Sequence, residues 1–593
     1  MYDNIPASIF FFVACSAAGS GLFLVRKSSK QLAGISWIVT TVLALTCWHA
    51  VVAGLVNLVH IPVNIVSIGL ADLIAGAALW VVIWRRRERQ QYEWRAADLV
   101  VTVGLVAFTA MFFVLRTKGF RLDIHYTTID PAAWLLNSVD VVKTQSVQGM
   151  YYQELTNGLF IQWLSPLTTP DYFYKIFVFS GGLFLLIAGL AFYAAIRRHL
   201  NNKIVTVVGV GVVFLYLCGY PLNATLWGFV WLSMGVILIT HLTFLSDSLL
   251  ADEIDKWPAV ALLMSGSLAL IVCYAMFAPV VFISVGLVLV VKYRGKWVLS
   301  KGSVLVGVSV FALPLVIGLL YMFGGVFTDG TTVGGALSTE GASYRDLFSN
   351  FVPFAPVALF GAYKLFRVRQ INVQLVLLPV LLVFMAGIFA LGMVGKASSY
   401  YFYKTYNVLW LVVLFLLVVG ISKIANRETA GLLGMYGIVW ALILGLSVSG
   451  FEHQIQSRNN LFDPVAKATD MNDIFSANRW DLKGQGVLNL DQQSLYHYVY
   501  NNYVKEGLPA VPFVGYWENA YWYDAISSQP PQYATYSMYN DPTWIMDMVK
   551  QSPSDYVLVL TDASSQAYQD NKAYFDALPH VYSNDAGFVA RLH

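Results

Sequence analysis

The chain has 593 residues and a formal net charge of +3, with 58% hydrophobic and only 12% charged residues. Soluble globular domains are about 45–50% apolar and about 25% charged. A water-soluble protein of this length could not cover so much apolar surface, and the same proportions exclude disorder, collagen and coiled-coil arrays. The composition, with a mean hydropathy of +0.62, therefore predicts an α-helical polytopic membrane protein.

A transmembrane helix needs about 20 apolar residues to cross a hydrocarbon core of about 30 Å. The first apolar run follows Asp3 rather than a basic cluster, so we expect a retained span and not a cleaved signal peptide. The pair around Phe277 is divided by only a short break, and the segment 350–364 contains two prolines. About fourteen spans are predicted, at 8–25, 34–58, 62–84, 98–115, 172–196, 204–220, 224–245, 258–275, 277–291, 302–325, 350–364, 373–394, 404–422 and 430–450.

The basic residues of the membrane region alternate between loops in a regular way. If the N-terminus is outside, 21 of the lysines and arginines before Phe451 fall in inner loops and 8 in outer loops. Cytoplasmic loops carry the excess of basic residues in membrane proteins. The sequence therefore predicts an outer N-terminus and an extracytoplasmic C-terminal segment.

The composition changes after the last predicted span. Residues 1–451 form the predicted transmembrane domain, and residues 452–593 carry 16 acidic and 8 basic residues with ordinary polarity. Short apolar runs at 487–490, 556–560 and 588–592 indicate strands, separated by helical patterns up to residue 503 and at 563–577. We expect a small extracytoplasmic α/β domain.

Polar residues concentrate in two long outer loops, 116–171 and 326–349. The first contains apolar and aromatic stretches, which indicate short helices at the membrane interface. The second is rich in glycine, threonine and serine and is a candidate lid. Asp123, His125 and Asp130 lie close together in the first loop, where a carboxylate could act as a general base or hold a divalent ion. Alternatively Asp130 simply caps a helix, because Pro131 follows it.

A cluster of tyrosines and lysines precedes the span at 404–422. It includes Lys396, Tyr401, Tyr403 and Lys404. Lysine binds phosphate as a point charge, and aromatic faces pack on sugars or isoprenoid chains. The alternative is an ordinary interfacial aromatic belt with lysines that extend to the headgroups. In the C-terminal segment, Trp517 and Glu518 lie in an aromatic run that suits a carbohydrate platform or a small-domain core.

Asp72 lies midway along the third predicted span, where a charge costs about 2.5–3.5 kcal/mol. It is either a proton or ion site or, as we favour, a carboxyl hydrogen-bonded to a neighbouring helix, with Asn64 one contributor. The four cysteines lie in apolar runs and are predicted to be core residues without disulfides or metal.

Many spans, a long outer loop with acidic residues near a span end and an outer α/β domain resemble the GT-C superfamily of polyprenyl-phosphate-dependent membrane glycosyltransferases. The terminal run from Pro579 to Leu592 also resembles the closing strand pair of such proteins. The resemblance implies a catalytic base or metal contact at Asp123 or Asp130, with Mg²⁺ or Mn²⁺ as the cofactor if there is one. It places the lipid phosphate at the cluster of Tyr401, Tyr403 and Lys404. The expected substrate-binding residues are Arg121, His125, Glu154, Lys396, Tyr401, Tyr403, Lys404, Trp517 and Glu518.

The expected partners are a polyprenyl-phosphate-linked sugar donor, a glycan or lipid acceptor and membrane lipids. No glycine-rich phosphate loop is present, so an inner-face nucleotide site is not predicted, and no nucleic-acid partner is expected. The short loops fit a bacterial cell membrane. Two alternatives remain open from the sequence: a transporter or flippase for a glycan or lipid, and a non-catalytic envelope assembly protein.

Overall fold

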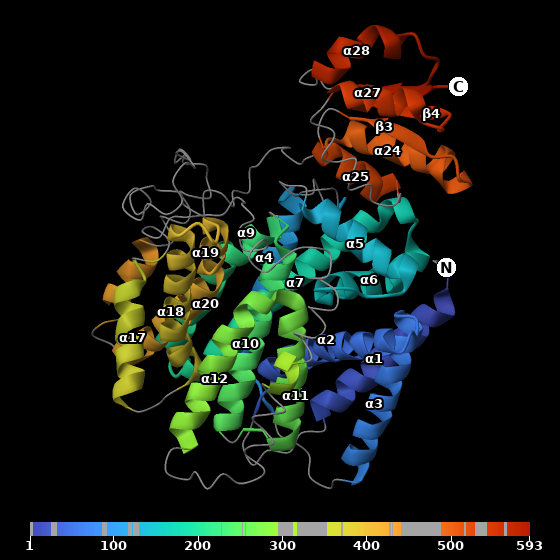
Figure 1. Cartoon of the computed structure of the whole chain (residues 1–593). Helices are drawn as coiled ribbons and strands as arrows, with labels where there is room; N and C mark the ends of the chain where they lie inside the picture. The colour runs from blue at the N-terminus through green and yellow to red at the C-terminus, as the bar shows by residue number, and fades with distance from the viewer. Residues whose placement is uncertain are drawn as a thin grey trace.

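A computed structural model of the chain reveals a helical bundle with a small domain at one end (Figure 1). Among the described residues, ten helical segments are long and apolar enough to cross a membrane, so the chain is a polytopic membrane protein. The structure describes residues 4–24, 32–85, 92–116, 121–122, 130–226, 228–251, 253–254, 256–293, 312–316, 351, 353–368, 372–425, 429, 431–439, 488–514, 517–527, 542–561 and 566–593.

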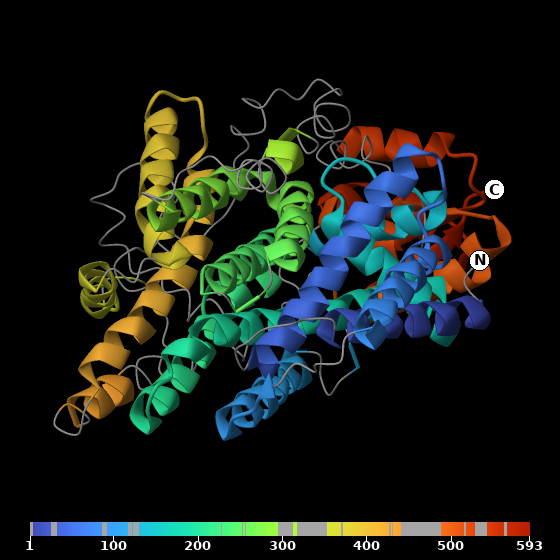
Figure 2. The same ribbon diagram turned by 90° about the horizontal axis from the view of Figure 1, so that it is seen from below.

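The bundle consists of helices because a backbone in hydrocarbon must satisfy its hydrogen bonds within its own segment. Seen from below, the blue helices α1 to α3 and the yellow to orange helices α17 to α20 lie on opposite flanks. The green helices α10, α11 and α12 lie between them (Figure 2). The helices are α1 (Ile5–Leu24), α2 (Gly34–Leu58), α3 (Ile65–Arg85), α4 (Ala96–Arg116), α7 (Phe173–Ile196), α8 (Lys203–Cys218), α9 (Tyr220–Leu226), α10 (Val230–Leu250), α11 (Lys256–Tyr274), α12 (Ala278–Tyr293), α17 (Ala355–Arg367), α18 (Val373–Met393), α19 (Ser399–Lys404) and α20 (Tyr406–Ile424). Two short strands, β1 (Leu32–Ala33) and β2 (Tyr92–Glu93), pair in parallel beside α2 and α4.

Polar contacts join several helix ends at the end of the bundle where α4 begins. Arg197 binds Asp98 there, with Nε 2.7 Å from Oδ1 and Nη2 2.9 Å from Oδ2. At the same end Asp247 accepts a hydrogen bond from the Val373 backbone N–H. The alternation of the loops and the side of the membrane that each end faces stay predictions.

The predicted spans 258–275 and 277–291 form one apolar stretch, Pro258–Val288, of 31 residues. A straight helix of that length would measure about 46 Å, well over the hydrocarbon thickness. A 3-10 turn at Ala275–Phe277 divides it into α11 and α12. The predicted span 350–364 corresponds to the 13-residue helix α17. Most of 302–325 and of 430–450, and the whole outer loop 326–349, lie outside the described residues.

The loop 116–171 forms two helices, as the sequence predicts, and they cover one end of the bundle. They are α5 (Asp130–Thr144) and α6 (Tyr152–Leu164). They form a layer between the bundle and the C-terminal domain, and α25 (Trp517–Ser527) of that domain packs on α5 (Figure 1). Their position is therefore more enclosed than the membrane surface that the sequence suggests.

The described part of the C-terminal domain is α/β, with a sheet in the order β3-β4-β6-β5. β3 and β4 are parallel, and the other neighbouring pairs are antiparallel. The predicted strand at 487–490 is wrong: Asn489 accepts from the backbone N–H of Gln492 and caps a helix, while Val487 lies outside the described residues. The predicted strands at 556–560 and 588–592 are confirmed. The elements are α24 (Leu490–Asn502), β3 (Ala510–Phe513), α25, α27 (Pro542–Gln551), β4 (Tyr556–Leu560), α28 (Gln566–Asp576), β5 (His580–Asn584) and β6 (Gly587–Arg591).

The crossing of α17 and α20 depends on two glycines and provides a test of the packing. A Cβ on Gly361 would lie 2.2 Å from the Leu416 carbonyl oxygen, and one on Gly420 would lie 2.2 Å from that of Val357. Membrane helices pack closely through such small residues. We expect Gly420→Ala to lower the free energy of unfolding by about 1–3 kcal/mol through overpacking. The measurement is thermal unfolding of the purified protein in detergent.

The matched control is Gly387→Ala in α18, where an added Cβ meets nothing within 4 Å. Alanine is the better helix former, so this variant should be at least as stable as the wild type. Equal melting temperatures for the two variants would contradict the described crossing.

Candidate functional site

The structure places the predicted site residues in three groups. Asp123 and His125 lie outside the described residues, as do the side chains of Trp517 and Glu518 at the start of α25. Arg121 and Lys396 are exposed. The others are described, and Asp130, Tyr401 and Lys404 come together.

The ammonium of Lys404 lies among four aromatic rings. Its Nζ is 3.9 Å from the ring centre of Tyr400 and 5.2 Å from that of Tyr401, both on α19. The rings of Phe229, just before α10, and Tyr274, at the end of α11, lie at 5.5 and 5.7 Å. Such cation–π contacts contribute about 0.5–2 kcal/mol each. Three parts of the bundle, α19, the residue before α10 and the end of α11, therefore surround this cation.

Asp130 begins α5 and reaches this cluster because of an unusual turn. Gly228 has a φ of 74°, a conformation that favours glycine. Pro131 packs against it so closely that a Cβ on Gly228 would lie 2.4 Å from the proline Cδ. This contact docks the start of α5 beside Phe229 and Lys404.

The carboxyl of Asp130 interacts with Lys404 electrostatically. Burial raises the pKa of Asp130 above its usual range, and the charge of Lys404 opposes part of that rise. Within the described part of the chain, neither group has a hydrogen-bond or ion-pair partner. Tyr521 of α25 also lies near, since burial first and then Asp130 raise the pKa of its phenol.

A stripe of side chains on α5 leads from Asp130 into the interior. Trp134 and Asn137 follow at positions i+4 and i+7, and these positions lie on one face of a helix. The Trp134 ring lies 4.7 Å from that of Trp231 on α10. At the end of the stripe, Asn137 hydrogen-bonds to Glu154 of α6.

Several polar atoms along this stripe are buried without a hydrogen-bond partner in the structure. They are Nε1 of Trp134, Nε1 of Trp231, the hydroxyl of Tyr274 and Oε2 of Glu154. A buried polar atom that lacks a partner costs about 1–3 kcal/mol. A polar ligand that reached these side chains would supply the missing hydrogen bonds.

Glu154 is 6% exposed, and burial raises its pKa to about 8. Its hydrogen bond with Asn137 opposes that rise only in part. The carboxyl therefore keeps its proton at neutral pH and can donate a hydrogen bond.

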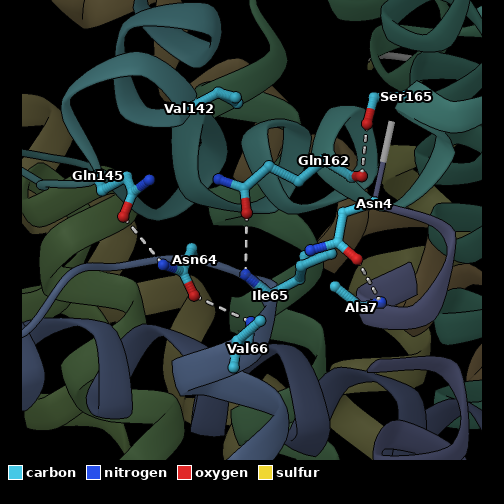
Figure 3. Close-up of a pocket in the computed structure, with 9 residues that line it drawn as sticks. All are labelled: Asn4, Ala7, Asn64, Ile65, Val66, Val142, Gln145, Gln162 and Ser165. Atoms are coloured by element: carbon cyan, nitrogen blue, oxygen red, sulfur yellow. Dashed lines mark hydrogen bonds between the residues drawn. The ribbon is translucent and has the colours of Figure 1, made fainter. Parts of the chain in front are cut away.

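Tyr403 and a polar cavity lie apart from the cluster around Lys404. Tyr403 faces Phe402 and Tyr406, with ring centres at 5.3 Å from each, and is not among the rings around Lys404. A cavity of about 140 Å³ lies near the other end of α5. Its amides cap helices: Asn4 accepts from Ala7 N–H, and Gln162 accepts from Ile65 N–H (Figure 3). Its lining residues are Asn4, Ala7, Asn64, Ile65, Val66, Val142, Gln145, Gln162 and Ser165.

A second polar contact joins the C-terminal domain to the bundle. His497 of α24 binds Asp171, with Nδ1 2.8 Å from Oδ2, and its ring stacks on Tyr172 at 4.3 Å. Asp171 is fully buried. Sequence reasoning missed this pair, because neither residue stands in a recognisable motif.

No known protein family matches this chain, and neither a characterised protein nor a solved structure shows significant similarity to it.

Sequence reasoning found Asp130 and Lys404 separately. It did not find the buried N–H groups of Trp134 and Trp231, the hydroxyl of Tyr274 or the raised pKa of Glu154. The spacing of Asp130, Trp134 and Asn137 was the available signal, since the three positions share a helical face. Trp231 and Tyr274 lie in apolar spans, where nothing local distinguishes them from core residues.

The protonation of Glu154 predicts how stability depends on pH. The unfolded carboxyl ionises near 4.5, whereas the folded one holds its proton up to about 8. The free energy of unfolding should therefore decrease as the pH rises from about 4.5 to about 8, because the folded state binds more protons in that interval. In Glu154→Gln this part of the decrease should be absent. Melting temperatures of the purified protein across that range measure the slope.

Glu506→Gln, at an exposed position, serves as the control and should keep the wild-type slope. An unchanged slope in Glu154→Gln would show that Glu154 ionises normally.

Proposed function

We propose that the chain is a membrane glycosyltransferase that transfers a sugar from a polyprenyl-phosphate donor to a glycan or lipid acceptor at the outer face. One observation carries the proposal: Lys404 is held among aromatic rings beside Asp130, and within the described chain no carboxylate forms a direct ion pair with its ammonium. Asp130 is close enough to interact with this cation but does not form a direct ion pair with it, so an anionic ligand could bind the ammonium directly.

The donor phosphate fits the position of Lys404. A phosphate oxygen would accept charge-assisted hydrogen bonds from Nζ, and such bonds contribute about 1.5–3 kcal/mol. The faces of Tyr400, Tyr401 and Phe229 surround the same point and suit an isoprenoid chain or a sugar ring. A lipid-linked donor also suits a cluster among helices that cross the membrane.

Asp130 is the proposed general base. The acceptor hydroxyl gives its proton to the Asp130 carboxylate as its oxygen forms a bond to the anomeric carbon. The bond between that carbon and the phosphate oxygen breaks, and polyprenyl phosphate leaves with the electron pair. Lys404 neutralises the charge of this leaving group. A divalent ion at Asp130 is an open part of the proposal, since Asp123 lies outside the described residues.

The unpartnered polar atoms below Asp130 suit the sugar. Its hydroxyl groups would accept hydrogen bonds from the indole N–H groups of Trp134 and Trp231 and from the protonated carboxyl of Glu154. These partners would satisfy atoms that otherwise lose hydrogen bonds on folding.

Removing the proposed base provides the direct test. Asp130→Asn should lower the transfer rate by about 10²–10⁴-fold with little change in donor affinity, because an amide cannot accept the proton. In the wild type the rate should fall on acidification as Asp130 takes up a proton. Since burial raises its pKa, that fall should occur at a higher pH than for an exposed aspartate. The assay measures sugar transfer from polyprenyl-phosphate donor to acceptor in detergent or proteoliposomes.

Asp140→Asn, at an exposed position of the same helix, is the matched control and should keep full activity. Full activity of Asp130→Asn would remove the assigned base.

Lys404→Met should weaken donor binding by roughly 10- to 100-fold, because it removes charge-assisted hydrogen bonds to the phosphate. Binding of the labelled polyprenyl-phosphate sugar measures the change. Lys396→Met changes an exposed lysine of the same segment and should bind the donor as the wild type does. Equal affinities for the two variants would assign Lys404 to the aromatic belt instead.

The proposal requires an extracytoplasmic site. The C-terminal domain packs on α5, so both must face the same side. A cysteine introduced at exposed Asn502 should react with a membrane-impermeant maleimide in intact cells, whereas one at exposed Arg85 should react only after the cells are opened. The opposite pattern would place the site in the cytosol and exclude a donor delivered to the outer face.

A further inference from the structure

A cluster of a cysteine, a histidine and an aspartate lies within the bundle, between α1, α2 and α3. Asp72 of α3 is fully buried, and its Oδ2 lies 2.8 Å from Nε2 of His49 on α2. Cys15 of α1 donates to the same oxygen at 3.2 Å. The predicted neighbour of Asp72, Asn64, instead caps α3 and binds Gln145. The expectation that a neighbouring helix satisfies Asp72 holds, but the partners are different.

The packing of α1 against α3 brings these side chains together. A Cβ on Gly76 would lie 2.9 Å from the backbone nitrogen of Ala18, so the two helices approach closely at this point. Close approach through small residues is typical of membrane helix pairs. Phe11 lies on the same side, with its ring 6.0 Å from that of His49.

One ligand atom of the cluster is unused. Oδ1 of Asp72 is buried and has no hydrogen-bond partner in the structure, while Oδ2 accepts from both neighbours. One sulfur, one nitrogen and one oxygen ligand atom from the three residues all lie within 4.8 Å of one another. A metal ion bound among them would satisfy the carboxylate more fully than the hydrogen bonds do.

We propose that Cys15, His49 and Asp72 bind one transition-metal ion of the Zn²⁺ class. Thiolate, imidazole and carboxylate are the ligands that Zn²⁺ takes in proteins, at about 2.0–2.3 Å. Mg²⁺ and Ca²⁺ require oxygen ligands and do not suit a site with a thiolate. The site is separate from the cluster of Asp130 and Lys404 and does not depend on the function assigned there.

Charge balance favours this ligand set in an apolar environment. A thiolate and a carboxylate together carry two negative charges, and a divalent ion offsets both while the imidazole stays neutral. Binding releases the thiol proton to solvent. The complex is then uncharged, which avoids the cost of an isolated ion in a medium of low dielectric constant. Three protein ligands leave a fourth tetrahedral position for water or another ligand.

The test uses the full-length protein in detergent, stripped with a chelator and titrated with Zn²⁺ and with Co²⁺. We expect one ion per chain, a thiolate-to-cobalt charge-transfer band in the near ultraviolet and a melting temperature that rises with metal. Cys15→Ser should lose the band, and His49→Ala should lose at least tenfold in metal affinity.

Cys218→Ser removes a buried cysteine of α8 and serves as the control, which should keep one ion and the band. Circular dichroism and gel filtration establish whether each variant is folded. If the site variants do not fold, the titration of the wild type alone tests the proposal. Stoichiometric binding without a cobalt–thiolate band, or no binding, would overturn it. Wild-type affinity and spectrum in folded Cys15→Ser would overturn it as well.

Discussion

The contact between Pro131 and Gly228 positions the whole candidate site. Gly228 adopts a positive φ and has no side chain, so the proline ring can lie directly against the turn before α10. A side chain at this point would push α5 away from the bundle. The docked helix brings Asp130 beside Lys404 and directs Trp134 and Asn137 towards Trp231 and Glu154. The electrostatic and hydrogen-bonding properties of the site all follow from this arrangement.

Two buried polar clusters of the bundle differ in how well they are satisfied. At the end of the bundle where α4 begins, Asp98 accepts from Arg197 at 2.7 and 2.9 Å and from the Tyr193 hydroxyl at 2.8 Å. This cluster is complete and needs no ligand. Around Lys404 and Glu154, by contrast, buried donors and acceptors lack partners. The combination of such groups with the enclosed Lys404 supports a binding role there.

The C-terminal domain packs against the region that holds the candidate site. His497 anchors α24 to Asp171 at the start of α7, and α25 packs on α5, where Tyr521 lies near Asp130. The domain therefore covers the helix that carries the proposed base. The helices of the domain thereby hold α5 from the side opposite the bundle.

The sequence by itself determined the membrane class, most of the spans, the short helices of the first outer loop and the strands β4 and β6, because these follow from local apolar content and periodicity. It also singled out Asp130 and Lys404 as candidates. Only the tertiary structure paired them, joined Cys15 and His49 to Asp72, and buried Glu154, which raises the pKa of its carboxyl. In a soluble helix the apolar face shows which side packs against the rest of the protein. A membrane helix is apolar towards both lipid and protein, so this signal is lost. Contacts between distant spans are therefore decided by close packing and buried polar groups, which local sequence patterns do not reveal.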